Sequence, residues 1–416
     1  MSLWPVYTGS SEPHDGIAEL PAPPPWRAFE GGPELATPAE GDDASATSPD
    51  RRHRARTYRA TDRAVQLVNA ALYLRRPLLV TGPPGSGKSS LAYAVARELR
   101  LGPVLRWNIT SRTTLHDGLY QYDPLSRLYA AGRAAAREVP PDTELPPGGG
   151  HLSDRGLPSD GGLAPDGGVP SDHRLPSDRR LAPDGGVPSD HRLPSDRRLA
   201  PDHRLAPDHR LAPDRRLAPD SGLQDHLRLG PLGTALLPYG RPRALLIDEI
   251  DKCDLDLPND LLNILEEGQY EIPELVRAAR HTPSAEVMVD GTDERVEVSR
   301  GRVRCRSFPF VVLTSNGERE FPPAFLRRCV RLELHQPRDA HLESIVRAHL
   351  GEPDAYARKL IDRFLSRGTD GELATDQLLN AIYLTGAAGI DASSRDELAE
   401  QLMPYLSRTG DEPDAF

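Results

Sequence analysis

The sequence predicts an α/β fold in which a parallel sheet, flanked by helices, is followed by a small α-helical domain. Four short apolar segments have the length of buried strands, at 77–82, 104–110, 243–248 and 308–316. Segments with helical spacing of apolar residues accompany them at 57–75 and 89–100. Strands that are apolar throughout and alternate with helices are typical of a parallel sheet buried on both faces. From about residue 336 the pattern becomes helical, which predicts the second domain.

The composition argues against several classes of protein. With 42 Pro, 35 Gly and only 38% hydrophobic residues among 416, part of the chain is not expected to enter a packed core. The net charge of −11 makes nucleic acid an unexpected partner, because non-specific binding needs a basic surface. No apolar stretch approaches the roughly 20 residues that span a bilayer, and the start does not resemble a signal peptide. We therefore expect a cytoplasmic protein with reduced, isolated cysteines and no membrane partner.

Two segments lie outside the periodic pattern. Residues 1–55 are rich in Pro, Gly and Ala and predict an irregular arm, either a disordered tail or, because of its aromatic residues Trp4, Tyr7, Trp26 and Phe29, an arm that docks on a neighbouring domain or subunit. Residues 145–224 form a hexapeptide repeat with units such as LPSDRR and LAPDHR. The Pro in each unit removes a backbone donor and disfavours a β-helix.

The repeat is therefore expected to be a disordered insert in a surface loop. A fold tolerates such an insert because the entropy cost of closing a loop grows only logarithmically with its length. The predicted organisation is an arm at 1–55 and an α/β domain at 56–335 that the insert at 145–224 interrupts. A helical domain with a C-terminal tail follows at 336–416.

The strongest motif is GPPGSGKSS, which fits the phosphate-loop pattern G-x-x-x-x-G-K-[ST] between a strand and a helix. Its glycines let the backbone bend until N–H groups converge on phosphate oxygens, and the following helix adds the positive end of its dipole. The lysine would reach the β- and γ-phosphates, and the serine after it would offer a hydroxyl to Mg²⁺. The predicted nucleotide-binding residues are Gly82, Pro83, Pro84, Gly85, Ser86, Gly87, Lys88, Ser89 and Ser90.

A second motif, ALLIDEID, places two acids at the C-terminal end of an apolar strand, where open α/β sheets bind ligands. Asp248 would hold Mg²⁺ together with Ser89, and Glu249 would act as a general base on the attacking water. Two acids after an apolar run are a weak signal alone, but together with the phosphate loop they predict nucleotide hydrolysis. Asp251 and Lys252 are expected at the surface.

These motifs, together with VVLTSN and FPPAFLRRC, occur in the order and spacing of AAA+ ATPases. The chain most resembles the MoxR-like group, over residues 57–140 and 225–390. The resemblance implies a P-loop NTPase core of the AAA+ type followed by a helical lid. It also implies ATP with Mg²⁺ at the site and a homo-oligomeric ring, which we expect to be a hexamer.

The resemblance also assigns residues outside the two motifs. Asn316 stands where the family keeps a polar residue that senses the γ-phosphate, with Thr314 and Ser315 as weaker substitutes. Arg328 aligns best with the arginine that reaches into the neighbouring subunit's site, and Arg327 is the alternative. The two arginines could equally belong to a solvated helix end.

The lid departs from the family pattern. The segment LATDQLLNAIYL carries Thr375 and Asp376 where the family has an arginine, so a lid contact to nucleotide would need another residue, such as Arg358 or Arg363. Two further segments correspond to the ring's pore, namely a hairpin at Asp290–Gly291 and the stretch 111–123. Its candidates for gripping a client, or alternatively for packing beneath the sheet, are His116, Leu119, Tyr120 and Tyr122.

The expected function is an ATPase that couples ATP hydrolysis to the remodelling or activation of a client protein. One alternative is a slow nucleotide-dependent switch or scaffold. Another is a DNA-directed motor or GTPase of the same P-loop class, against which the acidic net charge speaks. A small-molecule kinase is least favoured, because Asn316 and the two arginines would then have no role. Nothing in the sequence identifies the client.

Overall fold

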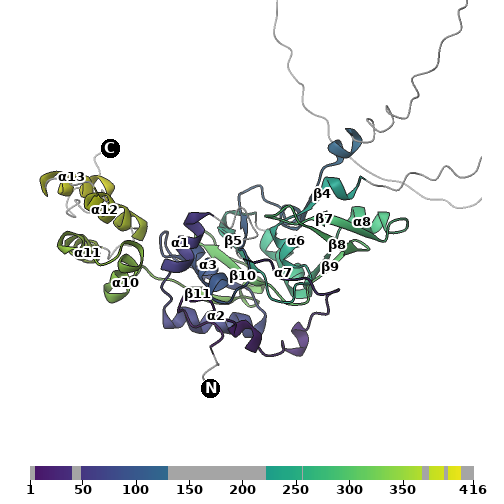
Figure 1. Cartoon of the computed structure of the whole chain (residues 1–416), viewed down its shortest axis with the longest axis horizontal. Coiled ribbons are helices and arrows are strands. Elements are labelled where there is room, and N and C mark those ends of the chain that lie inside the picture. Colours follow the sequence, from purple (N-terminus) through teal and green to yellow (C-terminus); the bar gives the residue numbers. More distant parts are fainter. Residues whose placement is uncertain are drawn as a thin grey trace, which may run out of the picture. The chain divides into compact units, whose positions relative to one another are not determined.

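The computed structural model describes residues 5–39, 48–129, 222–254, 256–367, 374–387 and 392–403. All of them belong to one compact unit made of 1–136 and 216–416 (Figure 1). Trp4, most of the predicted insert and the C-terminal tail lie outside the described residues. No helix in the described part is both long and apolar enough to cross a bilayer.

The centre of the unit is a five-stranded parallel sheet in the order β11-β1-β10-β5-β2. Its strands are β1 (Leu78–Thr81), β2 (Leu105–Asn108), β5 (Ala244–Asp248), β10 (Phe310–Ser315) and β11 (Val330–Glu333). The two strands with the longest apolar runs, β5 and β10, lie side by side in the interior and are buried at every position. The predicted fold, a parallel sheet flanked by helices, is confirmed.

Helices cover both faces of this sheet. On one face, Leu78 and Val80 of β1 pack with α1 (Pro49–Thr57), α2 (Asp62–Leu74) and α3 (Lys88–Glu98). On the other face, Leu79 joins a second apolar core with α6 (Pro231–Ala235) and α7 (Leu257–Glu267). Adjacent residues of a strand point to opposite faces, so these three residues feed both cores.

Two small sheets extend the second core. The first has the order β3-β4-β7-β8 and contains the hairpin predicted around Asp290–Gly291. Its strands are β3 (Tyr120–Tyr122), β4 (Leu227–Leu229), β7 (Ser284–Met288) and β8 (Arg295–Ser299). The second pairs β6 (Gln269–Glu271) with β9 (Arg302–Arg304). Short helices in the described part of the chain include α4 (Leu115–Leu119), α8 (Pro273–Ala278) and α9 (Pro323–Leu326), and 3-10 turns include η3 (Gln224–His226) and η4 (Ile250–Lys252).

The candidate pore residues divide into two groups. Leu119 and Tyr120 are buried, and the Tyr120 hydroxyl donates to Glu274, so these two side chains pack within the domain. His116 is exposed and Tyr122 is partly buried. Gripping of a client therefore remains a prediction for His116 and Tyr122 alone.

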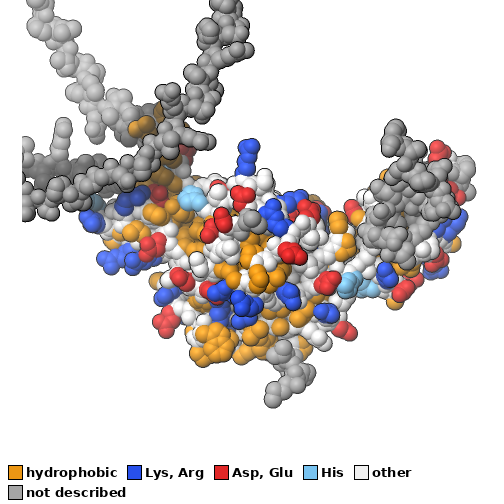
Figure 2. Space-filling model, turned by 180° about the vertical axis from the view of Figure 1, so that it is seen from behind, with side chains coloured by type: hydrophobic (Ala, Val, Ile, Leu, Met, Phe, Trp, Pro, Cys, Tyr) orange, Lys and Arg blue, Asp and Glu red, His pale blue; other side chains and the backbone are white. Residues whose placement is uncertain are grey.

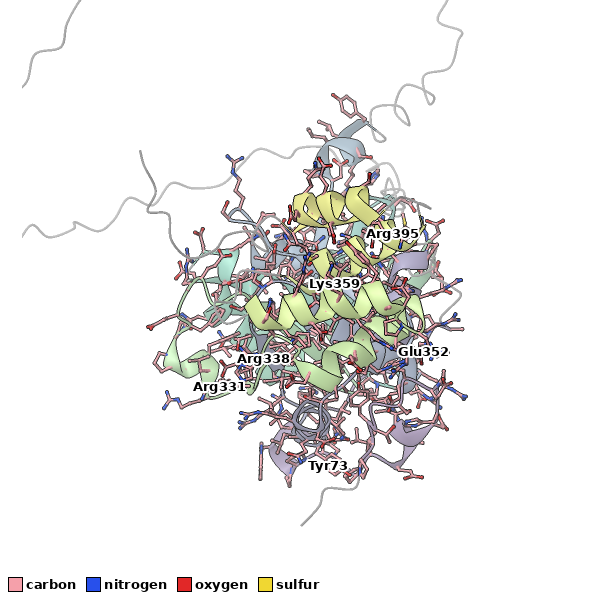
Figure 3. All side chains as sticks on the ribbon, turned by 90° about the vertical axis from the view of Figure 1, so that its left-hand side faces the viewer. Tyr73, Arg331, Arg338, Glu352, Lys359 and Arg395 are labelled. Carbon is pink, nitrogen blue, oxygen red and sulfur yellow. The ribbon has the colours of Figure 1, made fainter. Side chains whose placement is uncertain are left out.

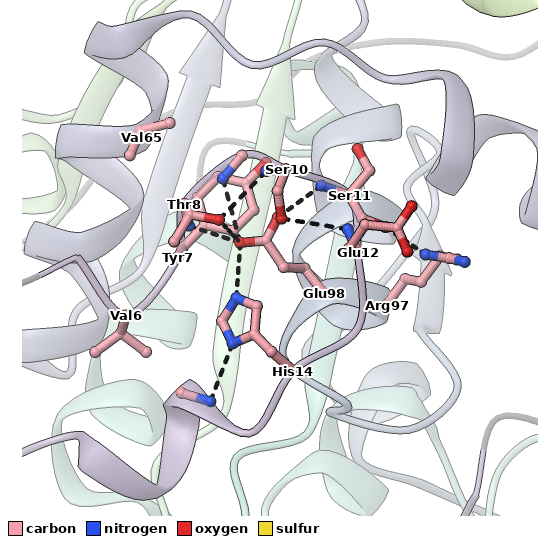
Figure 4. Close-up of polar contacts among 12 residues, drawn as sticks. Val6, Tyr7, Thr8, Ser10, Ser11, Glu12, His14, Val65, Arg97 and Glu98 are labelled. Carbon is pink, nitrogen blue, oxygen red and sulfur yellow. Dashed lines mark hydrogen bonds and ion pairs between the residues drawn. The ribbon is translucent and has the colours of Figure 1, made fainter.

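The described part of the N-terminal arm, residues 5–39, is docked on the α/β domain. The Asn69 side chain on α2 accepts the N–H groups of Val6 and Tyr7 at 2.8 and 2.9 Å and donates to the Tyr7 carbonyl at 2.7 Å. Further along, backbone N–H groups of Thr8, Gly9 and Ser11 donate to the Glu98 carboxylate at the end of α3 (Figure 4). Val6 and Tyr7 are almost fully buried, so they contribute to the core.

The arm continues through two short 3-10 turns, η1 (Gly16–Glu19) and η2 (Pro25–Arg27), to the residues that precede β1 and β10. There the Arg27 guanidinium lies over the rings of Phe29 and Phe308, and it donates to the carbonyls of Arg75 and Glu266. Of the two interpretations of residues 1–55, a docked arm describes residues 5–39. Helix α1 occupies residues that the sequence analysis expects to be irregular.

In the described residues after β11, four helices have a core of their own. They are α10 (Asp339–Leu350), α11 (Ala355–Arg367), α12 (Thr375–Ala387) and α13 (Ala392–Leu402). Leu342, Leu360, Phe364 and Leu378 are among the residues of this core. Polar contacts link α11 to α13, since Tyr356 donates to Asp396 at 2.9 Å and Lys359 lies 3.8 Å from the same carboxylate. Figure 3 labels Lys359 among these helices.

Candidate functional site

The phosphate loop connects β1 to α3 in a conformation that requires its glycines. Gly82, Gly85 and Gly87 have φ values of 150°, 74° and 87°, a region that residues with a Cβ rarely adopt. A Cβ on Gly82 would also lie 2.2 Å from the Leu334 carbonyl oxygen. The loop ends at the first turn of α3, whose unbonded N–H groups and dipole favour an anion. This geometry is that of a phosphate cradle.

Lys88 is folded back over this loop. Its Nζ donates to the carbonyls of Gly82 at 2.7 Å and Pro83 at 2.9 Å, and the residue is 9% exposed. Burial lowers the pKa of Lys88, while the neighbouring carboxylates of Asp251, Asp248 and Glu249 oppose that shift. The ammonium group therefore lies in an acidic surrounding, where an incoming phosphate competes with the loop carbonyls for its protons.

Asp248, at the end of β5, connects the phosphate loop to two neighbouring strands. Its Oδ1 accepts the hydroxyls of Ser89 at 2.7 Å and Thr314 at 2.6 Å, and its Oδ2 accepts the Arg106 guanidinium at 2.9 Å. Burial alone would raise the pKa of Asp248, but the hydrogen bonds from Thr314 and Ser89 and the charge of Arg106 outweigh it. The net pKa therefore lies below the ordinary value.

Glu249 adopts a left-handed conformation with φ 63°, which turns the chain sharply after β5. Its N–H donates to the Thr314 hydroxyl at 2.9 Å, so the turn is fixed by the adjacent strand β10. The side chain is half-exposed and forms a 2.8 Å ion pair with Lys252. The carboxylate is thus accessible to solvent beside the buried Asp248.

Asp251 is where the sequence analysis is wrong. We expected a surface residue, but Asp251 is 4% exposed. Its Oδ2 accepts the backbone N–H groups of Asn316 at 2.9 Å and Glu318 at 3.2 Å. The adjacent Lys252 is exposed as expected. Because η4 curls back toward β10, the third residue after Asp248 faces inward.

Asn316 follows the last residue of β10 and is partly buried. Since β10 lies next to β5, this position is at the same edge of the sheet as Asp248 and Glu249. Thr314 and Ser315, the weaker substitutes, are almost fully buried. The Thr314 hydroxyl bonds Asp248, and the Ser315 hydroxyl accepts the Gly317 N–H at 3.0 Å.

Arg327 and Arg328 follow α9, and the described structure records no bond from either to the phosphate loop. The Arg328 guanidinium pairs with Glu266 on α7 and is 42% exposed. Arg327 is exposed, and its carbonyl accepts a hydrogen bond from Arg76 at 3.1 Å. Both arginines directly follow the end of α9, and the fold leaves both accessible from outside the chain.

A cleft of about 940 Å³ opens beside the phosphate loop. Its walls include Gly85–Ser90, residues of α1, the segment 333–338 after β11, and Thr375 and Asp376 at the start of α12. A Cβ on Gly85 would lie 2.9 Å from the Cβ of Ala374, so the start of α12 is against the loop. The volume lies within the range of small-molecule sites.

The cleft contains donors suited to a nucleotide and Mg²⁺. The hydroxyls of Ser86 and Thr375 are buried, line the cleft and have no hydrogen-bond partner in the described chain. Of the two oxygen ligands proposed for Mg²⁺, Ser89 lines the cleft, and its hydroxyl lies 2.7 Å from the carboxylate of Asp248, which is not among the described lining residues. Arg358 and Arg363 are not among the described lining residues, whereas Arg338 is.

Residues 78–121 match the AAA family. This is the ATPase family associated with various cellular activities, and the matched segment carries the phosphate loop, α3 and β2. The match supports an AAA+ ATPase domain. Among solved structures, NtrX from Brucella abortus in complex with ADP is similar at 12% identity and a TM-score of 0.35, over 89% of this chain and 60% of that chain. The chain thus spans less than two thirds of that protein's length. No curated protein matches the sequence.

Two residues of this candidate site, Arg106 and Asp251, were not expected there from the sequence. Arg106 bonds the Asp248 carboxylate, and Asp251 holds the loop after β10. Thr314, named only as a weaker substitute for Asn316, bonds Asp248 instead. The sequence gives only a weak indication of this role for Arg106, which lies on β2, the strand next to the one that ends in Asp248. On the face that Figure 2 displays, basic and acidic side chains are interspersed.

Proposed function

We propose that this protein is a Mg²⁺-dependent ATPase of the MoxR-like AAA+ type that remodels or activates a partner protein. The observation that carries the proposal is the 2.7 Å hydrogen bond between the Ser89 hydroxyl and the Asp248 carboxylate. It joins the phosphate loop to the acidic strand end, although the two residues are 159 positions apart. The backbone that would bind phosphate and the two oxygens that would bind Mg²⁺, those of Ser89 and Asp248, therefore lie at the same edge of the sheet.

In this proposal each side chain has one task. Backbone N–H groups of Gly85 to Lys88 and the Lys88 ammonium bind the phosphates, and Ser89 with Asp248 holds Mg²⁺. When bound, Mg²⁺ neutralises charge on the β- and γ-phosphates. Glu249 accepts a proton from the attacking water, and the Asn316 amide orients that water without adding negative charge. For this Glu249 must leave Lys252, its partner in the described structure.

The proposed active form is a ring, with a hexamer as the expected size. Arg328 is half-exposed and does not contact its own phosphate loop, so it is available to a neighbouring subunit. An arginine delivered in this way stabilises the transferring phosphoryl group by about 10³-fold or more in rate. Arg327, which is also exposed, is the alternative donor.

The same site also favours a second function, a slow nucleotide-dependent switch. Thr375 and Asp376 occupy the wall of the cleft where an arginine would couple the lid to the nucleotide. Glu249 is held by Lys252 rather than directed into the cleft. Both features are expected to slow turnover while leaving nucleotide binding intact.

The test is ATP turnover measured over a range of protein concentrations. We expect the activity per subunit to rise steeply with concentration, because the site is completed by a second chain. Glu249→Gln and Arg328→Ala should both lose turnover while still binding nucleotide, and Glu320→Gln, an exposed acid near α9, is the control for charge removal. Activity per subunit that stays constant down to a sedimenting monomer would reject the shared site. Stoichiometric hydrolysis with long-lived ATP-bound oligomers would favour the switch.

A further inference from the structure

Two chain segments meet beyond the ends of β5 and β10 and are bonded to each other at several points. The N–H of Glu249 donates to the Thr314 hydroxyl at 2.9 Å. In the opposite direction, the N–H groups of Asn316 and Glu318 donate to Asp251. The turn after β5 and the loop after β10 are therefore held in one relative position. That position sets the distance between the Glu249 carboxylate and the Asn316 amide.

Asp251 is the centre of this junction. Gly317 has a φ of 81°, which curves the loop so that the N–H groups on either side of it point at one carboxylate oxygen, Oδ2. The N–H of Gly317 itself donates to the Ser315 hydroxyl, so the two N–H groups that converge on Asp251 come from the residues on either side of the glycine. A neutral side chain would attract them less, because hydrogen bonds to a charged acceptor are roughly twice as strong.

The other oxygen of this carboxylate has a different environment. Asp251 Oδ1 is buried and has no hydrogen-bond partner in the described chain. Asp251 also lines a cleft of about 580 Å³ together with Thr110, Ser111, Glu249 and Glu318. Burying a carboxylate with one oxygen that lacks a hydrogen bond lowers the stability of the fold. If Asp251 only held the loop in place, a residue that does not lower the stability in this way would serve equally well.

We propose that Asp251 is a positioning residue of the hydrolysis site, which fixes the backbone of Asn316 so that its amide and the Glu249 carboxylate reach the same water. This role rests on the proposed ATPase function. Asp251 does not touch the nucleotide or the water in this scheme; it acts through Asn316. Loss of its charge would let the loop after β10 drift while the phosphate loop keeps its shape.

The experiment compares Asp251→Asn with Asp254→Asn, an exposed acid three residues later, by kcat and by the dissociation constant of ATP. A displacement near 1 Å costs up to about 10²-fold in rate, so we expect kcat of Asp251→Asn to fall by 10- to 100-fold with ATP binding unchanged. Asp254→Asn should resemble wild type. Equal kcat values for the two variants would overturn the proposal.

A double-mutant cycle with Asn316→Ala separates positioning from general stability. If Asp251 acts through the Asn316 side chain, adding Asp251→Asn to Asn316→Ala should lower kcat by less than twofold further. If the losses of kcat in the two single variants multiply in the double variant, the positioning role is overturned.

Should Asp251→Asn not fold, Gly317→Ala replaces it, because a Cβ there meets no atom within 4 Å and only the backbone turn is strained. A wild-type turnover that survives Glu249→Gln would instead reject the proposed function itself.

Discussion

Asp248 shows how one carboxylate can organise a site built from distant parts of the chain. The phosphate loop contributes Ser89, β2 contributes Arg106 and β10 contributes Thr314, and all three donate to the same side chain. A buried carboxylate is stable only when its lone pairs are used. The three donors therefore stabilise the fold and orient the oxygen that would face Mg²⁺.

Thr314→Val tests this at the scale of one hydroxyl. The substitution keeps the shape but leaves the Glu249 N–H and one Asp248 lone pair without a partner, so we expect a loss of about 1–3 kcal/mol in the free energy of unfolding. Urea denaturation at neutral pH measures it. Thr314→Ser, which retains the hydroxyl, should recover most of the loss. A Val variant as stable as wild type would show that the hydroxyl is not needed.

The same variant predicts a change in pH dependence. Because the pKa of Asp248 in the folded protein lies below its ordinary value of 3.8, the ionised group stabilises the fold above that value. This contribution is lost as the pH falls through the folded pKa. Thr314→Val removes a bond that lowers the folded pKa, so the stability that ionised Asp248 contributes should be smaller and its loss on acidification should be complete at a higher pH.

At the scale of single residues, the sequence predicts those site residues whose role follows from a short motif around them. Lys88 and Ser89 follow from their spacing in one loop, and Asp248 from its place after an apolar run. Thr314 and Asp251 could not be placed, because their partners are 60 or more residues away in sequence. Nothing in the pattern DEID shows that the chain turns at Glu249 and buries the next acid.

At the scale of elements, the N-terminal arm is held by side chains of two helices. Asn69 on α2 pairs with the backbone of Val6 and Tyr7 much as a neighbouring strand would. Glu98, in the last turn of α3, accepts the backbone N–H groups of Thr8, Gly9 and Ser11. Since α3 begins at the phosphate loop, the arm stabilises the far end of the helix that carries Lys88.

Asn69→Ala should therefore destabilise the domain. Two N–H groups and one carbonyl of the arm would be left without partners in a buried place, so we expect a loss of about 2–4 kcal/mol in unfolding free energy. Gln66→Ala, on the exposed side of the same helix, is the matched control. Limited proteolysis should cleave Asn69→Ala faster within residues 5–15. Equal cleavage of the two variants would show that the Asn69 side chain does not hold the arm on the domain.

Four strands of the parallel sheet, β1, β2, β5 and β10, could be predicted because each lies in a short, largely apolar segment between polar turns. The fifth strand, β11, was not predicted, because charged residues alternate with apolar ones in its sequence VRLE. The arm could not, since residues 5–39 have no periodicity and their burial depends on partners such as Asn69 and Glu98. Helix α1 was missed for a related reason. Its sequence PDRRHRART has few apolar residues, and Ala55 is its one buried aliphatic side chain. Tertiary contacts, not local pattern, make this segment part of the domain.

At the scale of the whole molecule, the structure explains how the fold accepts a long interruption. β3 and β4 are antiparallel neighbours, with Tyr122 opposite Leu227. The Asp123 N–H donates to the His226 carbonyl at 2.9 Å, and Ser126 bonds the His226 ring at 2.9 Å. The two ends of the chain that flank residues 130–221 therefore leave the domain side by side. The hexapeptide repeat itself lies outside the described residues and stays a sequence-based prediction.

Replacing residues 130–221 by a Gly-Ser linker of about eight residues should thus leave the domain intact. Shortening the loop lowers the entropy cost of closing it, so we expect the free energy of unfolding to rise by about 1–2 kcal/mol. ATP turnover per subunit should stay within about twofold of wild type, because every proposed site residue lies outside the deleted stretch. As a control, a scrambled repeat of the same length should match the wild-type protein in both measurements.

A deletion variant that unfolds would show that the repeat contributes packing to the domain. A variant that folds but loses turnover would instead show that the repeat makes a contact needed for function. The β3–β4 pairing holds the two ends of the deleted segment together, so a distorted domain would not explain that loss.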